Sequence, residues 1–141
     1  MNDEILLNCT DLHAGYGRVP VLRGIRMVVR PGQFVSLIGP NGAGKSTVFK
    51  AITGFARLTS GTVTFDGQAI SGMRSDRLVP LGLAYIPQGR IVFGQMPVHD
   101  NLEMGAFTVS DAATRAKAFA RVYDLFPRLA ERRTQLAGTM S

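Results

Sequence analysis

The chain has 141 residues, 45% of them hydrophobic and 18% charged, which excludes a disordered protein and predicts one globular domain. No apolar run approaches the roughly twenty residues of a membrane span. The N-terminal stretch MNDE is acidic, unlike a secretory signal, so we expect a soluble intracellular protein. The net charge of +6 would suit an anionic partner, but we interpret it mainly as a solvated basic face. Because the arginines are scattered and do not alternate with aromatic residues, we expect no nucleic-acid partner.

The first predicted elements are strands at residues 5–12 and 25–29, and the second of these alternates in polarity. Residues 33–38 (QFVSLI) form a short apolar run that is typical of the middle of a parallel sheet. Residues 61–67 (GTVTFDG) alternate between glycines, which predicts a half-exposed strand of an antiparallel sheet. Residues 83–87 (LAYIP) predict another buried strand, ended by Pro87.

The stretch GPNGAGKST at residues 39–47 matches the phosphate-loop pattern G-x-x-x-x-G-K-[ST]. The pattern binds phosphate when a strand precedes it and a helix follows, because the backbone N–H groups then converge on one anion. The strand at 33–38 leads directly into the loop. A helix is predicted from Lys45 to the stop signal at Gly54, and its apolar positions share one face: Val48, Phe49 and Ile52.

The residue types of this loop suit a bound nucleoside triphosphate. Its glycines can adopt positive φ and leave room for close approach: Gly39, Gly42 and Gly44. The helix that follows contributes the partial positive charge of its N-terminus. Lys45 is expected to reach the β and γ phosphates, and the Ser46 hydroxyl is expected to be a ligand of Mg²⁺.

The last third of the chain is predicted to be helical. Ser110 and Asp111 supply capping chemistry for a helix that Pro127 stops. One face of this helix is apolar and aromatic, and we interpret it as a core face: Ala112, Ala116, Phe119, Tyr123 and Phe126. Residues 128–135 predict another short helix, with a break at Gly138.

The remaining reactive side chains indicate no separate active site. A single cysteine, Cys9, excludes an internal disulfide and predicts a small buried thiol. His13 and His99 have no spacing to a set of cysteines or carboxylates, so we interpret both as structural residues.

The order of motifs resembles that of an ATP-binding subunit of an ABC transporter. Tyr16-Gly17 comes first, then VLRGI at residues 21–25, the phosphate loop, and AYIPQ at residues 84–88. The resemblance covers essentially the whole chain and implies an α/β fold, a P-loop NTPase core with an antiparallel β layer. Residues 1–88 would form the nucleotide-binding core and that layer, and residues 89–141 the start of a helical subdomain, truncated before the signature motif.

The resemblance also implies roles for individual residues. The ring of Tyr16 would stack on adenine, which needs no contact with the edge of the base. Gln88 would contact Mg²⁺ or the attacking water with its side-chain amide. The resemblance assigns ATP binding to the following set: Tyr16, Gly39, Pro40, Asn41, Gly42, Ala43, Gly44, Lys45, Ser46, Thr47 and Gln88.

Two later stretches narrow the resemblance. PQGRIVFGQMPVHDNLEMGAF (residues 87–107) and FPRLAERRTQLAGTMS (residues 126–141) are similar to subunits that serve uptake of branched-chain amino acids, or of urea and short amides. This implies ATP and Mg²⁺ as cofactors, membrane permease subunits as partners, and a second ATP-binding subunit in a homo- or heterodimer. It implies a place in the cytoplasm, peripheral on the inner face of the plasma membrane.

The sequence also lacks parts that ATP hydrolysis needs. No apolar strand after Ser46 ends in Asp-Glu, so the carboxylate that would activate water is missing. A non-hydrolysing nucleotide-binding module and a phosphotransferase of the nucleotide-kinase kind are the alternatives. Without central strands, four apolar side chains would lose their neighbours, namely Phe34, Leu37, Leu83 and Ile86. We therefore expect a poorly stable, aggregation-prone chain.

Overall fold

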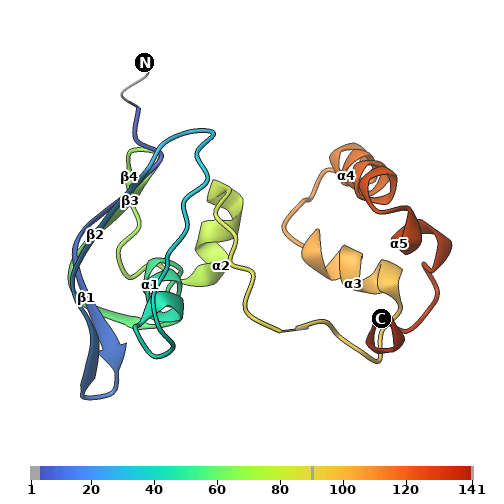
Figure 1. Cartoon of the computed structure of the whole chain (residues 1–141). Helices are drawn as coiled ribbons and strands as arrows, with labels where there is room; N and C mark the ends of the chain where they lie inside the picture. Colours follow the sequence, from blue (N-terminus) through green and yellow to red (C-terminus); the bar gives the residue numbers. More distant parts are fainter. Residues whose placement is uncertain (1–3, 90, 141) are drawn as a thin grey trace. The chain divides into compact units, whose positions relative to one another are not determined.

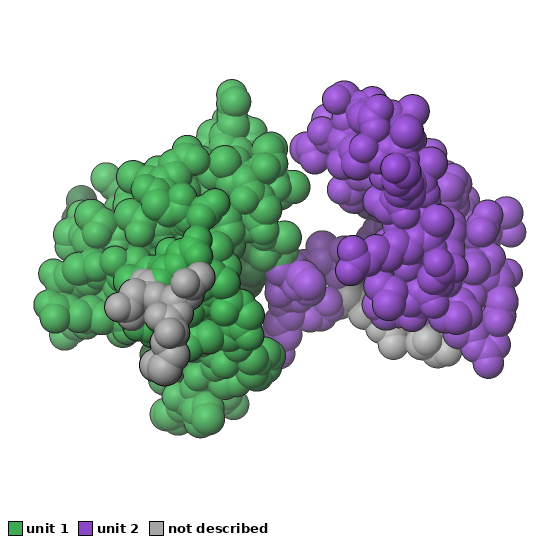
Figure 2. Space-filling view, turned by 90° about the horizontal axis from the view of Figure 1, so that it is seen from above, with its two compact units in different colours: residues 1–85 green, residues 86–141 purple. Residues whose placement is uncertain are grey.

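The structure is a computed structural model that describes residues 4–89 and 91–140. It divides into two compact units, Met1–Tyr85 and Ile86–Ser141 (Figure 2). The first unit contains the β-sheet and the helix that follows the phosphate loop, and the second is helical (Figure 1). The assignment of residues 1–88 to a nucleotide-binding core and of residues 89–141 to a helical subdomain stays a prediction.

The sheet of the first unit is antiparallel throughout. It consists of β1 (Leu7–Tyr16), β2 (Val19–Val29), β3 (Arg57–Phe65) and β4 (Gln68–Ala69), in the order β2-β1-β3-β4. The antiparallel strand predicted at 61–67 is thus confirmed within β3. The strands predicted at 5–12 and 25–29 are longer than expected, because they are two arms of one hairpin paired up to Tyr16↔Val19.

Helix α1 (Lys45–Ile52) packs on one face of this sheet (Figure 1). Sheet and helix bury one apolar cluster, whose largest fully buried members are Leu12, Leu22, Val63, Ile70 and Leu78. Leu78 comes from α2 (Ser75–Leu78), which, like the short 3-10 helix η1 (Val79–Leu81), the sequence did not predict. The predicted burial of Cys9 is confirmed, and that burial raises the pKa of its thiol to about 11.

The strands predicted at 33–38 and 83–87 are wrong as strands. A strand requires a hydrogen-bonded neighbour, and no segment among residues 4–89 and 91–140 pairs with either one. Phe34 and Ile86 are 93% and 91% exposed. By contrast, Leu37 and Leu83 pack partly on the core. The predicted loss of apolar neighbours therefore applies fully to two of the four side chains.

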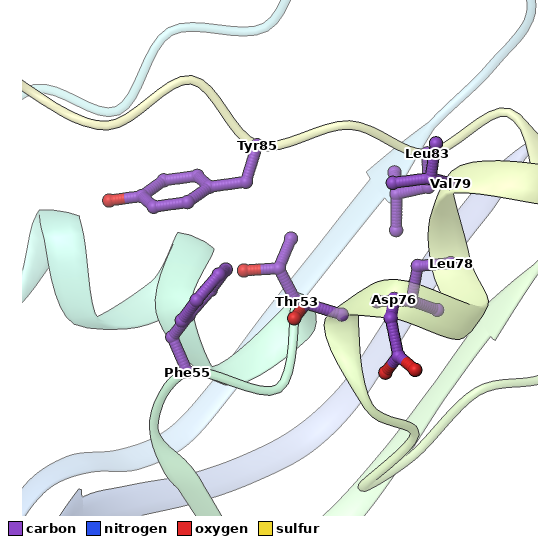
Figure 3. A pocket seen from close by; sticks show the side chains of 8 residues that line it. Thr53, Phe55, Asp76, Leu78, Val79, Leu83 and Tyr85 are labelled. Atoms are coloured by element: carbon purple, nitrogen blue, oxygen red, sulfur yellow. The ribbon is translucent and has the colours of Figure 1, made fainter. Parts of the chain in front are cut away.

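Residues 83–85 form the end of the first unit and contact the rest of it through their side chains. A cavity of about 240 Å³ lies between the end of α1, helix α2 and this segment (Figure 3). Tyr85 and Phe55 face each other across it, with ring centroids 5.5 Å apart. These contacts explain why Leu83 is half-buried although its segment belongs to no sheet.

The second unit contains α3 (Val98–Gly105), α4 (Ala112–Leu125), α5 (Pro127–Glu131) and the 3-10 helix η2 (Ala137–Thr139). The long predicted helix is confirmed as α4, and Asp111 caps it by accepting a hydrogen bond from the Thr114 N–H at 2.7 Å. The helix predicted at 128–135 is shorter and begins at Pro127. Within the described residues, no helix is long and apolar enough to cross a membrane.

The core face predicted for α4 is only partly correct. Tyr123 is buried and Phe119 is half-buried, and both rings lie next to His99 of α3. Ala116 and Phe126 are exposed. The apolar face is therefore covered at Phe119 and Tyr123, where His99 of α3 contacts both rings and Arg133 lies over the Tyr123 ring.

Candidate functional site

The phosphate loop has the conformation that an anion cradle requires at two of its three glycines. Gly42 and Gly44 have φ of 84° and 88°, the left-handed region that favours glycine, whereas Gly39 lies outside it. A Cβ on Gly42 would meet no atom within 4 Å, so the loop is open to a ligand there. A Cβ on Gly44 would lie 3.1 Å from Leu22 Cδ2, so this glycine also permits the close packing of loop on sheet.

Helix α1 begins directly at this loop, with Gly44 as its N-cap residue. The Val48 N–H donates to the Gly44 carbonyl at 3.0 Å, which is the first bond of the helix. The N–H groups of residues 45–47 precede that bond and so have no acceptor within the helix. The first turn carries no acidic residue. The end of α1 therefore offers N–H donors and partial positive charge to an anion.

Lys45 folds back over its own loop. Its Nζ donates to the carbonyls of Gly39 and Pro40, both at 2.7 Å, and the loop is tightened further by a bond from the Ala43 N–H to Pro40 O. An ammonium has three donors, so one remains beyond these two bonds. The contacts hold the positive charge at the mouth of the loop.

The hydroxyls of Ser46 and Thr47 have different surroundings. Ser46 is exposed in the first turn of α1, and its hydroxyl is available to a ligand. Thr47 is buried, and its Oγ1 lies 3.5 Å from the hydroxyl of Tyr16. The predicted loop residues Asn41 and Ala43 are exposed beside them.

The structure brings Tyr16 to the start of α1, although 31 positions separate it from Thr47. Tyr16 is the last residue of β1, and its side chain is 46% exposed. The ammonium of Lys50 lies 5.8 Å from the centroid of its ring. Sequence reasoning missed Lys50, although its i, i+3 spacing from Thr47 places both residues on one side of α1.

Gln88 belongs to the second unit, where it is exposed and lies outside any helix or strand. The phosphate loop belongs to the first unit. The structure describes Gln88 relative to the second unit and not relative to the phosphate loop. Its role at the metal therefore stays a prediction.

Both histidines make contacts with neighbouring side chains. His13 Nε2 lies 3.6 Å from Asp11 Oδ1. His99 Nδ1 lies 2.8 Å from the Tyr123 hydroxyl, and its Nε2 lies 3.6 Å from Glu103 Oε1. Within residues 4–89 and 91–140, no group of three or more His, Cys, Asp or Glu side chains is arranged to hold a metal ion.

Comparison with protein families gives one match over most of the chain. A family model described as ABC transporter matches residues 22–141. Among curated proteins, the high-affinity branched-chain amino acid transport ATP-binding protein BraG of Pseudomonas aeruginosa is 39% identical over 126 residues, 89% of this chain and 54% of that protein. LivF of Archaeoglobus fulgidus, named a probable branched-chain amino acid transport ATP-binding protein, is 34% identical over 96% of this chain and 57% of its own length. The chain thus spans about half the length of these relatives.

The solved structures that the chain resembles include ATP-binding cassettes of ABC transporters. A nucleotide-free ATP-binding cassette from an ABC transporter superposes with a TM-score of 0.81 at 26% identity, covering 98% of this chain and 60% of that one. The ADP conformation of an ATP-binding cassette of an ABC transporter gives a TM-score of 0.82 at 25% identity, over 98% and 59% of the two chains.

Proposed function

The chain belongs to the ABC transporter family, and from this premise we propose that it is the nucleotide-binding part of a subunit that drives import of branched-chain amino acids through a membrane permease by binding and hydrolysing ATP. The expected resemblance is confirmed, as is the α/β fold with a P-loop core and an antiparallel β layer. The amino acid substrate is supported by the names of the relatives BraG and LivF. Urea or a short amide is the alternative solute.

One observation carries the nucleotide site: the loop before α1 brings the positive charge of Lys45 together with N–H donors that have no acceptor within the helix. The open position at Gly42, the ammonium of Lys45 and the uncapped start of α1 all fit a chain of phosphates. On binding, Lys45 would turn its third donor, or the two that now bond to Gly39 and Pro40, towards the β and γ phosphates.

The Ser46 hydroxyl fits a Mg²⁺ ion that takes most of its ligands from phosphate and water, since Mg²⁺ in such sites uses only one or two protein oxygens. Bound Mg²⁺ would neutralise negative charge on the phosphates. Gln88 is the proposed second protein ligand. Tyr16, beside Thr47 at the start of α1, is the proposed platform for the base.

The partners and location follow from the family and are part of the same proposal. The complete subunit would pair with a second ATP-binding subunit and contact permease subunits at the inner face of the plasma membrane. Solute selection would then belong to the other chains of the transporter, so the nucleotide site described here serves any of the candidate solutes.

The test is nucleotide binding by Lys45→Ala. Displacement of a fluorescent ATP analogue from the 141-residue chain should show affinity weakened by about 10- to 100-fold, because hydrogen bonds to charged groups contribute about 1.5–3 kcal/mol each. Lys117→Ala, an exposed lysine on α4, is the matched control and should bind normally. Equal affinity of Lys45→Ala and the original chain would refute the role of this lysine.

A further inference from the structure

The ring of Tyr16 is held from two sides by residues of α1. Its hydroxyl lies 3.5 Å from Thr47 Oγ1. The ammonium of Lys50 lies over the ring, 5.8 Å from its centroid, within the roughly 6 Å at which a cation is attracted to an aromatic face. Both contacts come from the helix that starts at the phosphate loop, so loop and ring are positioned by one element.

The backbone of Tyr16 is also tightly constrained. Tyr16 pairs with Val19 at the closed end of the β1–β2 hairpin. The preceding residue, Gly15, is buried, and a Cβ there would lie 2.1 Å from Val19 O, so the two arms approach closely at this point. The hairpin thus positions the backbone of Tyr16, and two side chains of α1 contact its ring and hydroxyl.

We propose that Lys50 is a positioning residue of the nucleotide site: its ammonium covers one face of the Tyr16 ring, so that the opposite face is presented, already oriented, to the base of a nucleoside triphosphate. The proposal rests on the proposed function, which places the phosphates at the loop of residues 39–47. Lys50 contacts neither phosphate nor base in this arrangement. It acts by reducing the side-chain entropy that Tyr16 loses when a base stacks on it.

If Lys50 has this role, it should strengthen the binding of ligands that carry a base and leave the binding of ligands without a base unchanged. Stacking uses the face of a base and not its edge, so ATP and GTP should share the benefit of Lys50. Inorganic tripolyphosphate has no base and should bind the loop with the same affinity whether Lys50 is present or not. A lysine that bound phosphate directly would affect all three ligands.

The experiment compares Lys50→Met with the original 141-residue chain for ATP and for tripolyphosphate, by displacement of a fluorescent nucleotide. Methionine keeps much of the length of the side chain and removes its charge. The affinity for ATP should fall about two- to fivefold, the range of an exposed cation–π contact, while the affinity for tripolyphosphate stays unchanged. Lys50→Arg should restore ATP binding, and Lys117→Met is the matched control on α4.

Equal weakening of ATP and tripolyphosphate would overturn the proposal, because Lys50 would then be a phosphate ligand. Unchanged ATP affinity would overturn it as well. Lys45→Ala separates this result from a failure of the proposed function, because it should weaken both ligands whatever Lys50 does.

A second measurement needs no ligand. The chain contains no tryptophan, so the substitution Tyr16→Trp introduces a single fluorescent reporter at the ring position. In this background, Lys50→Met should increase quenching of the indole emission by acrylamide, because one face of the indole loses its cover. Identical quenching with and without Lys50 would overturn the proposal even if the chain bound no nucleotide.

Discussion

The two units differ in what holds each of them together. In the first unit, sheet, α1 and α2 share one buried apolar cluster around Leu12 and Leu22. In the second unit, the buried side chains within residues 86–89 and 91–140 are Val98 and Tyr123. Polar contacts contribute more there: Asn101 ties the segment before α3 to the helix, and His99 joins α3 to α4.

This difference has an energetic consequence. A buried aliphatic side chain contributes about 1.5–3 kcal/mol, whereas an intramolecular hydrogen bond contributes about 0.5–1.5 kcal/mol net, because water competes for the same groups. The phosphate loop therefore lies on the unit with the more stable interior. We expect the helical unit to open first when denaturant is added.

The largest expected effect is that of Leu12→Ala, in the centre of the first unit. Leu12 is fully buried, and removal of its side chain should cost about 2–5 kcal/mol from lost burial and the cavity left behind. The rate of Cys9 alkylation measures the loss of stability. The thiol is buried and its pKa is raised to about 11, so it reacts only when the first unit opens. Leu125→Ala, at a 63% exposed position of α4, should stay within about 0.5 kcal/mol. Equal effects of the two substitutions would show that the buried Leu12 stabilises the first unit no more than an exposed leucine does.

A smaller effect is expected from Asn101→Ala in the second unit. The Asn101 side chain accepts from the Phe93 N–H at 2.8 Å and donates to the carbonyls of Phe93, Met96 and Pro97. Its loss should destabilise the unit by about 1–3 kcal/mol, since these backbone groups lose their partner. Hydrogen exchange measured by mass spectrometry should become faster over residues 93–101.

A matched control exists on β1, where the Asn8 side chain has no hydrogen-bond partner among the described residues. Asn8→Ala should leave exchange over residues 93–101 as it was. If Asn101→Ala also leaves it unchanged, the polar contacts do not hold the second unit together.

The smallest expected effect is a pH dependence of α4. The hydrogen bond from Thr114 lowers the pKa of the Asp111 carboxyl below its ordinary value of 3.8. A group with a lowered folded-state pKa adds stability above its ordinary pKa and loses that contribution as the pH falls through the folded value. Helix signal at 222 nm should therefore decline slightly between about pH 5 and pH 2. Asp111→Asn should weaken this decline, and an identical titration curve would show that the cap adds nothing.

Local patterns in the sequence predicted much of the site, and non-local pairing accounts for the errors. The phosphate loop and α1 follow from neighbouring residues, and so does the Asp111 cap of α4. The segment at 33–38 has a strand-like sequence. It is not a strand, because a strand needs a hydrogen-bonded neighbour from another part of the chain, and no described segment pairs with it. The prediction of a core face for α4 was partly wrong for the same reason: Phe126 is apolar, but the fold leaves it 58% exposed.

The sequence alone determined the residue types that make an anion site: glycines that permit positive φ, a lysine at the mouth, and a helix beginning directly after them. These depend on backbone geometry within a few residues. Only the tertiary structure decided that Tyr16 lies against Thr47 and under Lys50, because the β1–β2 hairpin and α1 meet only when the sheet is packed. Contacts between distant segments depend on the shared core around Leu22, and no local pattern specifies them.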